Sequence, residues 1–166
     1  MTGQRVGYPS SDLPGETGFS IDLPTGWVAS PAPGVSFVAA PAVADDVPHM
    51  TLVASVRRID PRVTATDLSE ALGVQYQELD GCTVAAVEDL TIGDRTAAVR
   101  RLEHSGEEGS RVLQIQAIAV VPVCDEAADA VTITVTVPEG ADPTDLAPGI
   151  VASLRVAGPV TMPEEH

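Results

Sequence analysis

The stretch FSIDLPTGW, residues 19–27, decides how the fold begins. Its apolar residues alternate with polar ones up to Leu23, which is the pattern of a strand with one buried face. A turn signal follows at Pro24 to Gly26, because proline fixes φ and glycine tolerates a positive φ. Trp27, the only tryptophan, comes directly after this turn. A large aromatic residue there most often closes the end of a core, so we interpret Trp27 as a core residue; a ligand platform is the alternative.

The composition describes one acidic domain of ordinary size. The chain has 166 residues, of which 44% are hydrophobic, and that is enough for a single core. Its net charge is −15, from 24 acidic and 9 basic residues, and every basic residue is arginine. Such a chain repels phosphate backbones and anionic membrane surfaces, and only 3% of its residues are aromatic and could stack on bases. We therefore expect neither a nucleic-acid partner nor a membrane partner.

The N-terminal segment and the cysteines bear on location. Residues 1–16 contain no apolar stretch of a secretory signal, and no later segment has the unbroken apolar length of a transmembrane helix. We expect a cytoplasmic protein if Met1 is the natural start, whereas a trimmed chain would leave the location open. Cys82 and Cys124 form no metal motif, and we favour two free thiols over a disulfide, which would need an oxidising compartment.

Periodicity predicts seven strands and two helices. The strands are expected at residues 18–23, 35–39, 50–59, 83–92, 95–104, 111–121 and 130–137. The first helix is expected at residues 66–79, with Thr66 as its N-cap and Gly81 as its stop. The second helix is expected to begin near Asp142 or Pro148, because proline suits a first helical turn.

This element order, β-β-β-α-β-β-β-β-α, is typical of an α+β domain. Strands joined by short turns imply an antiparallel sheet, here of about six to seven strands, with the helices packed on it. We expect a single domain over residues 18–157. A flexible lead-in at residues 1–17 and a flexible tail at residues 158–166 are expected on either side.

Two phrases of the sequence resemble the PsbP-like (Mog-type) α/β sandwich group. The phrases are f-x-i-x-x-P-x-x-W in the first hairpin and i-x-x-S-l at the end of the last helix, here Phe19, Ile21, Pro24 and Trp27, then Ile150, Ser153 and Leu154. The likeness spans most of residues 18–156. It is nearest to the LpqN/LpqT-type proteins, many of them lipoproteins, although this chain lacks their signal peptide and lipobox cysteine. Members of the group, distantly including the Eag-type effector chaperones, are mostly binding or assembly proteins, so the resemblance implies binding and carries over no catalytic residues.

The two faces of the predicted sheet differ in chemistry. Along residues 130–137, branched apolar residues alternate with threonines, and neighbouring strand residues point to opposite faces. The apolar face is expected to take the helices. The other face is small and half-polar, with Gln114, Gln116, Thr132, Thr134 and Thr136. Such a surface costs little to desolvate and still offers hydrogen bonds, so it is our candidate partner-binding face; a plain solvated face is the alternative.

Carboxylates and an imidazole gather in the loop DDVPH. The weak metal candidates are Asp45, Asp46 and His49. These groups suit Zn²⁺ or Mn²⁺, but no second cluster completes a coordination shell. We therefore expect no metal site and no cofactor.

Two further polar sets contain groups that could carry chemistry. His104 lies beside Glu103, with Glu107 and Glu108 in the next loop. A general acid or base needs a pocket and a nucleophile, and neither is visible, so a solvated hairpin is favoured. The pairs Arg57-Arg58 and Arg100-Arg101 each place one arginine on either sheet face. They could bind an anion, but salt bridges within the chain are the favoured role.

These observations leave two functional hypotheses. The first is a non-enzymatic protein-binding or chaperone-like adaptor that uses the half-polar sheet face. Its partner would be another protein, either a secretion substrate or a second copy of the chain. The second is an enzyme or small-ligand carrier with a pocket between the sheet and the helices. We favour the first, because no catalytic constellation is visible.

Overall fold

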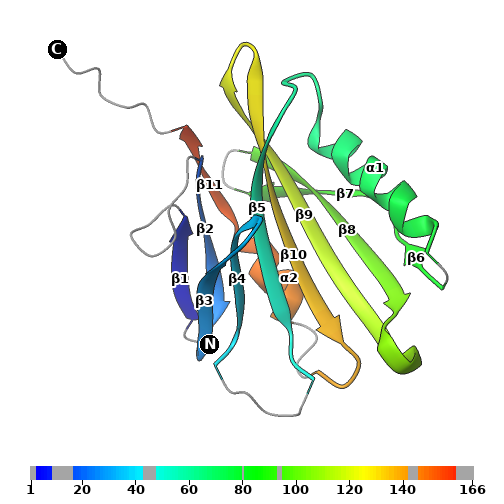
Figure 1. The fold of residues 1–166 in the computed structure, drawn as a ribbon. Coiled ribbons are helices and arrows are strands. Elements are labelled where there is room, and N and C mark those ends of the chain that lie inside the picture. Colours follow the sequence, from blue (N-terminus) through cyan, green and yellow to red (C-terminus); the bar gives the residue numbers. More distant parts are fainter. Residues whose placement is uncertain are drawn as a thin grey trace.

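The computed structural model describes residues 3–8, 17–42, 48–79, 81–92, 95–141 and 146–159. They form an α+β fold with two antiparallel sheets, which confirms the predicted class (Figure 1). The strands of the large sheet are β3 (Trp27–Ala32), β4 (Val35–Pro41), β5 (Thr51–Ile59), β6 (Thr83–Val84), β7 (Glu88–Ile92), β8 (Arg95–Ser105), β9 (Arg111–Cys124) and β10 (Ala127–Pro138). The small sheet contains β1 (Gly3–Tyr8), β2 (Thr17–Pro24) and β11 (Arg155–Pro159).

The large sheet is wider than predicted. It has eight strands in the order β3-β4-β5-β10-β9-β8-β6, with β7 also paired to β8. The small sheet has the order β1-β2-β11. The single strand predicted at residues 83–92 is divided into β6 and β7, because residues 85–87 leave the ladder.

Three strands were missed by the sequence analysis. β1 lies inside the expected flexible lead-in, and β11 runs into the expected tail. β3 contains Pro31, which argued for a break. All three strands lie at sheet edges. An edge strand tolerates weak alternation, or a proline without an N–H group, because one of its sides forms no hydrogen bonds to another strand.

The core lies between the inner face of the large sheet and a layer made of the small sheet and α2 (Leu146–Ala152). Figure 1 shows the small sheet and α2 beside the large sheet. The rings of Phe19 in β2 and Phe37 in β4 stack with centroids 5.8 Å apart, so the two sheets share one apolar interior. Trp27 is 6% exposed and belongs to this core, which confirms its interpretation as a core residue.

The helix α1 (Ala65–Gln77) lies on the opposite, outer face of the large sheet, against β8, β9 and β6. The prediction that both helices cover the branched apolar face is therefore wrong. The outer face carries its own apolar strip at Ala98, Leu102 and Ile118, each about 1% exposed, and α1 covers that strip. No helix among the described residues is long and apolar enough to cross a membrane. Cys82 and Cys124 are free, as predicted.

The start of α1 is fixed by a capping box two residues earlier than predicted. Thr64, and not Thr66, is the N-cap. Its hydroxyl accepts a hydrogen bond from the backbone N–H of Asp67 at 3.1 Å, and the Asp67 carboxylate accepts one from the backbone N–H of Thr64 at 3.0 Å. The pKa of Asp67 is lowered, first by the backbone and then by the side-chain hydrogen bond of Thr64.

We expect Thr64→Ala to lower the free energy of unfolding by about 1 kcal/mol, because an N–H at the helix start loses its acceptor. The pKa of the Asp67 carboxyl is lower in the folded protein than in the unfolded chain. The stability that Asp67 contributes is therefore fully present above its unfolded pKa and is lost as the pH falls through its folded pKa. The cost of Thr64→Ala should therefore shrink in acid. Urea unfolding at neutral pH and near pH 3 measures both effects. Thr66→Ala is the matched control, and a larger cost for that variant would contradict the assignment of the cap.

Candidate functional site

The outer face of the large sheet has a covered part and an open part. One cross-strand row runs in register through Ser30, Val38, Val53, Thr134, Gln116 and Arg100. At the β8 end of this row, Arg100 is 4% exposed beneath α1. At the β3 end, no helix among the described residues packs on the sheet.

We call the uncovered part the open face. It is made of small apolar residues, hydroxyls and one amide: Val28, Ser30, Val38, Ala40, Thr51, Val53, Ser55, Gln114, Thr134 and Thr136. Val28 is 52% exposed, which is unusual for a valine in a strand with a buried face. The first charged residue beyond the open face along β5 is Arg57. Five neighbouring strands thus present an uncharged surface on a chain of net charge −15.

The predicted binding residues fall on both sides of the boundary, and Thr134 lies at the boundary itself, on the open face and at the edge of the groove beside α1. Gln116 is only 6% exposed, and with Thr132 and Thr134 it lines a groove of 270 Å³ along Leu68 and Leu72 of α1. Its amide nitrogen donates to the Thr134 hydroxyl at 3.5 Å. On the open face, the Gln114 amide nitrogen donates to the Thr136 hydroxyl at 3.2 Å. Gln116 is therefore largely buried, whereas Gln114 is half-buried on the open face.

The arginine pairs do place one side chain on each face. Arg58 pairs with Asp129 at 2.5 Å on the inner side, and Arg100 pairs with Glu70 of α1 at 3.1 Å on the outer side. These two confirm the salt bridges expected within the chain. Arg57 and Arg101 have no ion pair within the part of the chain that the structure describes.

The other polar candidates are not brought together. Asp45 and Asp46 lie outside the described residues, and His49 is exposed. Within the described ranges, no group of three or more His, Cys, Asp or Glu side chains could hold a metal ion. His104 Nδ1 lies 3.3 Å from the carbonyl oxygen of Ser105, and Glu103 is paired with Arg111. These contacts agree with the favoured interpretation of this set as a solvated hairpin.

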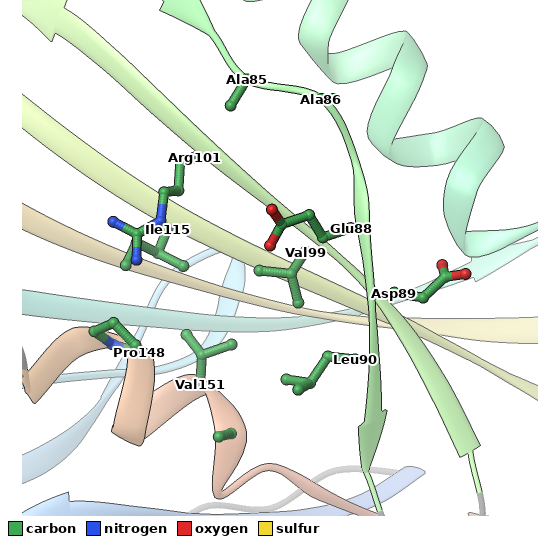
Figure 2. Close-up of a pocket in the computed structure, with 11 residues that line it drawn as sticks. Ala85, Ala86, Glu88, Asp89, Leu90, Val99, Arg101, Ile115, Pro148 and Val151 are labelled. Carbon is green, nitrogen blue, oxygen red and sulfur yellow. The ribbon is translucent and has the colours of Figure 1, made fainter.

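The inner face contains a cleft that the sequence analysis did not locate. It lies between β7, β8 and α2 and has a volume of 290 Å³ (Figure 2). Its apolar lining includes Leu90, Val99, Ile115, Pro148 and Val151, and its rim includes Ala86, Glu88 and Arg101. No local motif marks this cleft, because its lining comes from elements far apart in the chain.

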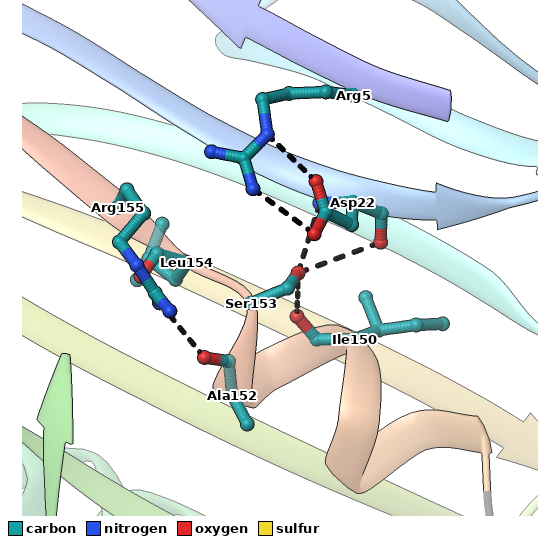
Figure 3. Close-up of polar contacts among 7 residues, drawn as sticks. All are labelled: Arg5, Asp22, Ile150, Ala152, Ser153, Leu154 and Arg155. Atoms are coloured by element: carbon teal, nitrogen blue, oxygen red, sulfur yellow. Dashed lines mark hydrogen bonds and ion pairs between the residues drawn. The ribbon is translucent and has the colours of Figure 1, made fainter. Parts of the chain in front are cut away.

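A small polar network fastens α2 to the small sheet (Figure 3). The Ser153 hydroxyl accepts a hydrogen bond from the backbone N–H of Asp22 at 2.8 Å and donates to the carbonyl of Ile150 at 2.6 Å. The Asp22 carboxylate pairs with Arg5 of β1 at 2.9 Å. The phrase that ends the last helix therefore has a structural role, since its serine joins the helix end to β2.

Two solved structures are similar to this fold over almost the whole chain. LpqN of Mycobacterium tuberculosis has a TM-score of 0.69 at 14% identity, over 95% of this chain and 92% of that chain. Cyanobacterial PsbP (CyanoP) from Synechocystis has a TM-score of 0.64 at 14% identity, over 94% of this chain and 93% of that one. This chain has the PsbP-like fold.

The PsbP-like fold confirms the resemblance drawn from the two short phrases. LpqN is described as involved in cell envelope biogenesis, a statement about that protein alone. No protein-family model matches the sequence, and no curated protein matches it either. At 14% identity the two structures establish the architecture, and function must be argued from the surfaces of this chain.

Proposed function

We propose that this protein is a non-enzymatic protein-binding module, chaperone-like or adaptor-like, that contacts its partner through the open face. The observation that supports this most strongly is that the described residues of the open face, drawn from five neighbouring strands, include no charged side chain, although the chain as a whole is strongly acidic. The centres of protein interfaces are depleted in charged residues relative to the remaining surface.

The chemistry of the open face suits an interface with a protein. Its valines and alanine lose little free energy when water leaves, and its hydroxyls still offer hydrogen bonds to a partner. The Gln114 amide is already held by Thr136, so less side-chain entropy is lost on contact. The partner surface should therefore be flat, uncharged and half-polar.

Two kinds of partner meet this description. A second copy of the chain brings the same uncharged face, and a symmetric dimer uses one self-complementary patch. A different protein, such as a secretion substrate, would need a matching surface of its own. Self-association can be measured without knowing the identity of any other partner.

The cytoplasm is the proposed location, and two features of the cysteines support it. Cys82 and Cys124 are free, and Cys124 is exposed at the end of β9, a state that reducing compartments maintain. Fractionation of the native host, with thiol labelling of Cys124 before lysis, tests this proposal. Recovery in the cell envelope would overturn it.

We expect Val53→Arg and Thr134→Arg each to abolish binding at the open face, because each places an unpaired charge at the centre of a desolvated contact. Light scattering over a concentration range measures self-association, and pull-down from host extract measures a different partner. The melting temperature of Val53→Arg should change little, since the site is half-buried and arginine can extend to water. Thr134→Arg also removes the acceptor of the Gln116 amide, so its melting temperature should fall more than that of Val53→Arg.

Val74→Arg is the matched control for these variants. Val74 is 57% exposed on α1, away from the open face, so the same charge is added with no effect on binding. Gln116→Arg is a poor test, because it would insert a charge beneath α1 and destabilise the fold. If binding survives both Val53→Arg and Thr134→Arg, the open face is not the site.

A further inference from the structure

The inner cleft follows from a mismatch in size between the two layers of the fold. The large sheet has eight strands, whereas α2 spans Leu146–Ala152 and packs against β2, β9 and β10. The inner face near β7 and β8 therefore extends past the end of its cover. The break between β6 and β7 places the small residues Ala85 and Ala86 at the rim, which keeps the cleft open.

The interior of the cleft is apolar. Leu90 and Val99 line it and are only partly buried, although both pack against the main core. Ile115 and Val151 also line the cleft and are buried. With a volume of 290 Å³, this space lies at the small end of the range for ligand pockets and is too small for a folded partner.

The charge at the rim is the second observation. Arg101 projects over the cleft in Figure 2 and has no ion pair within the described part of the chain. Five other arginines are paired: Arg5, Arg58, Arg62, Arg100 and Arg111. In a chain with 24 acidic residues, an arginine that faces an apolar cleft and has no carboxylate partner among the described residues is a candidate site for an anion.

The geometry points to a binding site for a small amphiphilic anion in this cleft. The apolar body of the ligand lies over Leu90, Val99 and Val151, and its carboxylate or similar anionic group contacts the Arg101 guanidinium. Glu88 and Asp89 also line the site; the Asp89 carboxylate points away from the cleft in Figure 2, whereas Glu88 stands on the same rim as Arg101 and disfavours a second negative charge, so the ligand carries one. This site is on the inner face and is independent of the proposed protein-binding face.

The test compares three probes with the same eight-carbon chain: octanoate, octanol and octylammonium. NMR titration follows the methyl signals of Leu90, Val99, Ile115 and Val151. We expect octanoate to bind more tightly than octanol, and octylammonium to bind more weakly than octanoate. Arg101→Gln should weaken octanoate by about tenfold and leave octanol unchanged, because one charge-assisted contact is lost.

Two further variants keep the proposal falsifiable. Glu88→Gln should strengthen octanoate binding, because it removes a like charge from the rim. Ala86→Trp, at an exposed position, should block all three probes while the melting temperature is retained. Thr134→Arg should leave octanoate binding unchanged, and Arg101→Gln should leave binding at the open face unchanged, so that failures of the two proposals are distinguishable.

Three results would overturn the inference. One is equal binding of octanoate by the parent protein and Arg101→Gln. Another is tighter binding of octylammonium than of octanoate, which would make Glu88 the anchor. The third is the absence of any shift in these methyl signals when octanoate is added, up to the concentration at which signals elsewhere in the protein begin to move.

Discussion

Arg58→Met should lower the free energy of unfolding by about 3 kcal/mol, the largest effect that we expect from a single change at a charged residue. Asp129 in β10 is 2% exposed, and Arg58 in β5 pairs with it at 2.5 Å. The hydroxyl of Thr17 in β2 also donates to the Asp129 carboxylate. Among the described residues, removing Arg58 leaves the buried carboxylate with one neutral donor, and the cost stays at the lower end of the usual range because Arg58 is half exposed.

A double-mutant cycle tests this explanation. Asp129→Asn alone should cost less than Arg58→Met, since a half-exposed arginine that loses its partner is still solvated. In the Asp129→Asn background, Arg58→Met should cost less than about 1 kcal/mol, because no buried charge remains. Urea unfolding measures all four proteins. Equal costs for Arg58→Met in both backgrounds would show that the charge pair is not the reason.

Gly73→Ala should lower the free energy of unfolding by about 2 kcal/mol, although alanine is the better helix former. Gly73 lies in the middle of α1, directly over Arg100. A Cβ atom at Gly73 would overlap the Arg100 guanidinium, which is held between the helix and the sheet and is paired with Glu70. The side chain would have to leave its site, and the buried charge would lose its partner.

Two controls separate this clash from helix propensity. In an Arg100→Ala background, Gly73→Ala should become stabilising by up to about 1 kcal/mol, the usual gain in a helix interior. Gly149 in α2 has no heavy atom within 4 Å of an added Cβ, so Gly149→Ala should also stabilise the protein. Thermal and urea unfolding measure the signs. A destabilising Gly73→Ala in the absence of Arg100 would contradict the argument.

The elements with strong periodicity were predictable from the sequence. The alternation in β10 correctly separates Ile133 and Val135, which are fully buried, from Thr134, which is half-buried. The turn before Trp27 was also predicted, and Gly26 adopts a φ of 86°, a value that favours glycine. These features depend on neighbours along the chain, so a local pattern is enough to reveal them.

The position of α1 was not predictable from local pattern alone. Arg100 and Gln116 are polar residues on strands; Arg100 was expected to form a salt bridge within the chain, and Gln116 was expected on the candidate partner-binding face. They are buried because strand register places them beside the apolar strip that α1 covers. Ala98 and Leu102 lie on one face of β8, and Ile118 lies on the same face of β9. These apolar residues were the available signal, because an apolar strip on that face requires an apolar partner. The inner cleft was missed for a related reason, since it depends on how far α2 extends over the sheet.

The pairing of β2 with β11 has a consequence for how the protein is made. Ser20 faces Arg155 in the small sheet, so this contact forms only after nearly the whole described chain has left the ribosome. Until then the buried residues of β2, among them Ile21 and Leu23, lack part of their cover. Pairings between residues so distant in sequence form slowly and leave strand edges open to other chains. The newly made protein is therefore prone to aggregate until β11 pairs with β2.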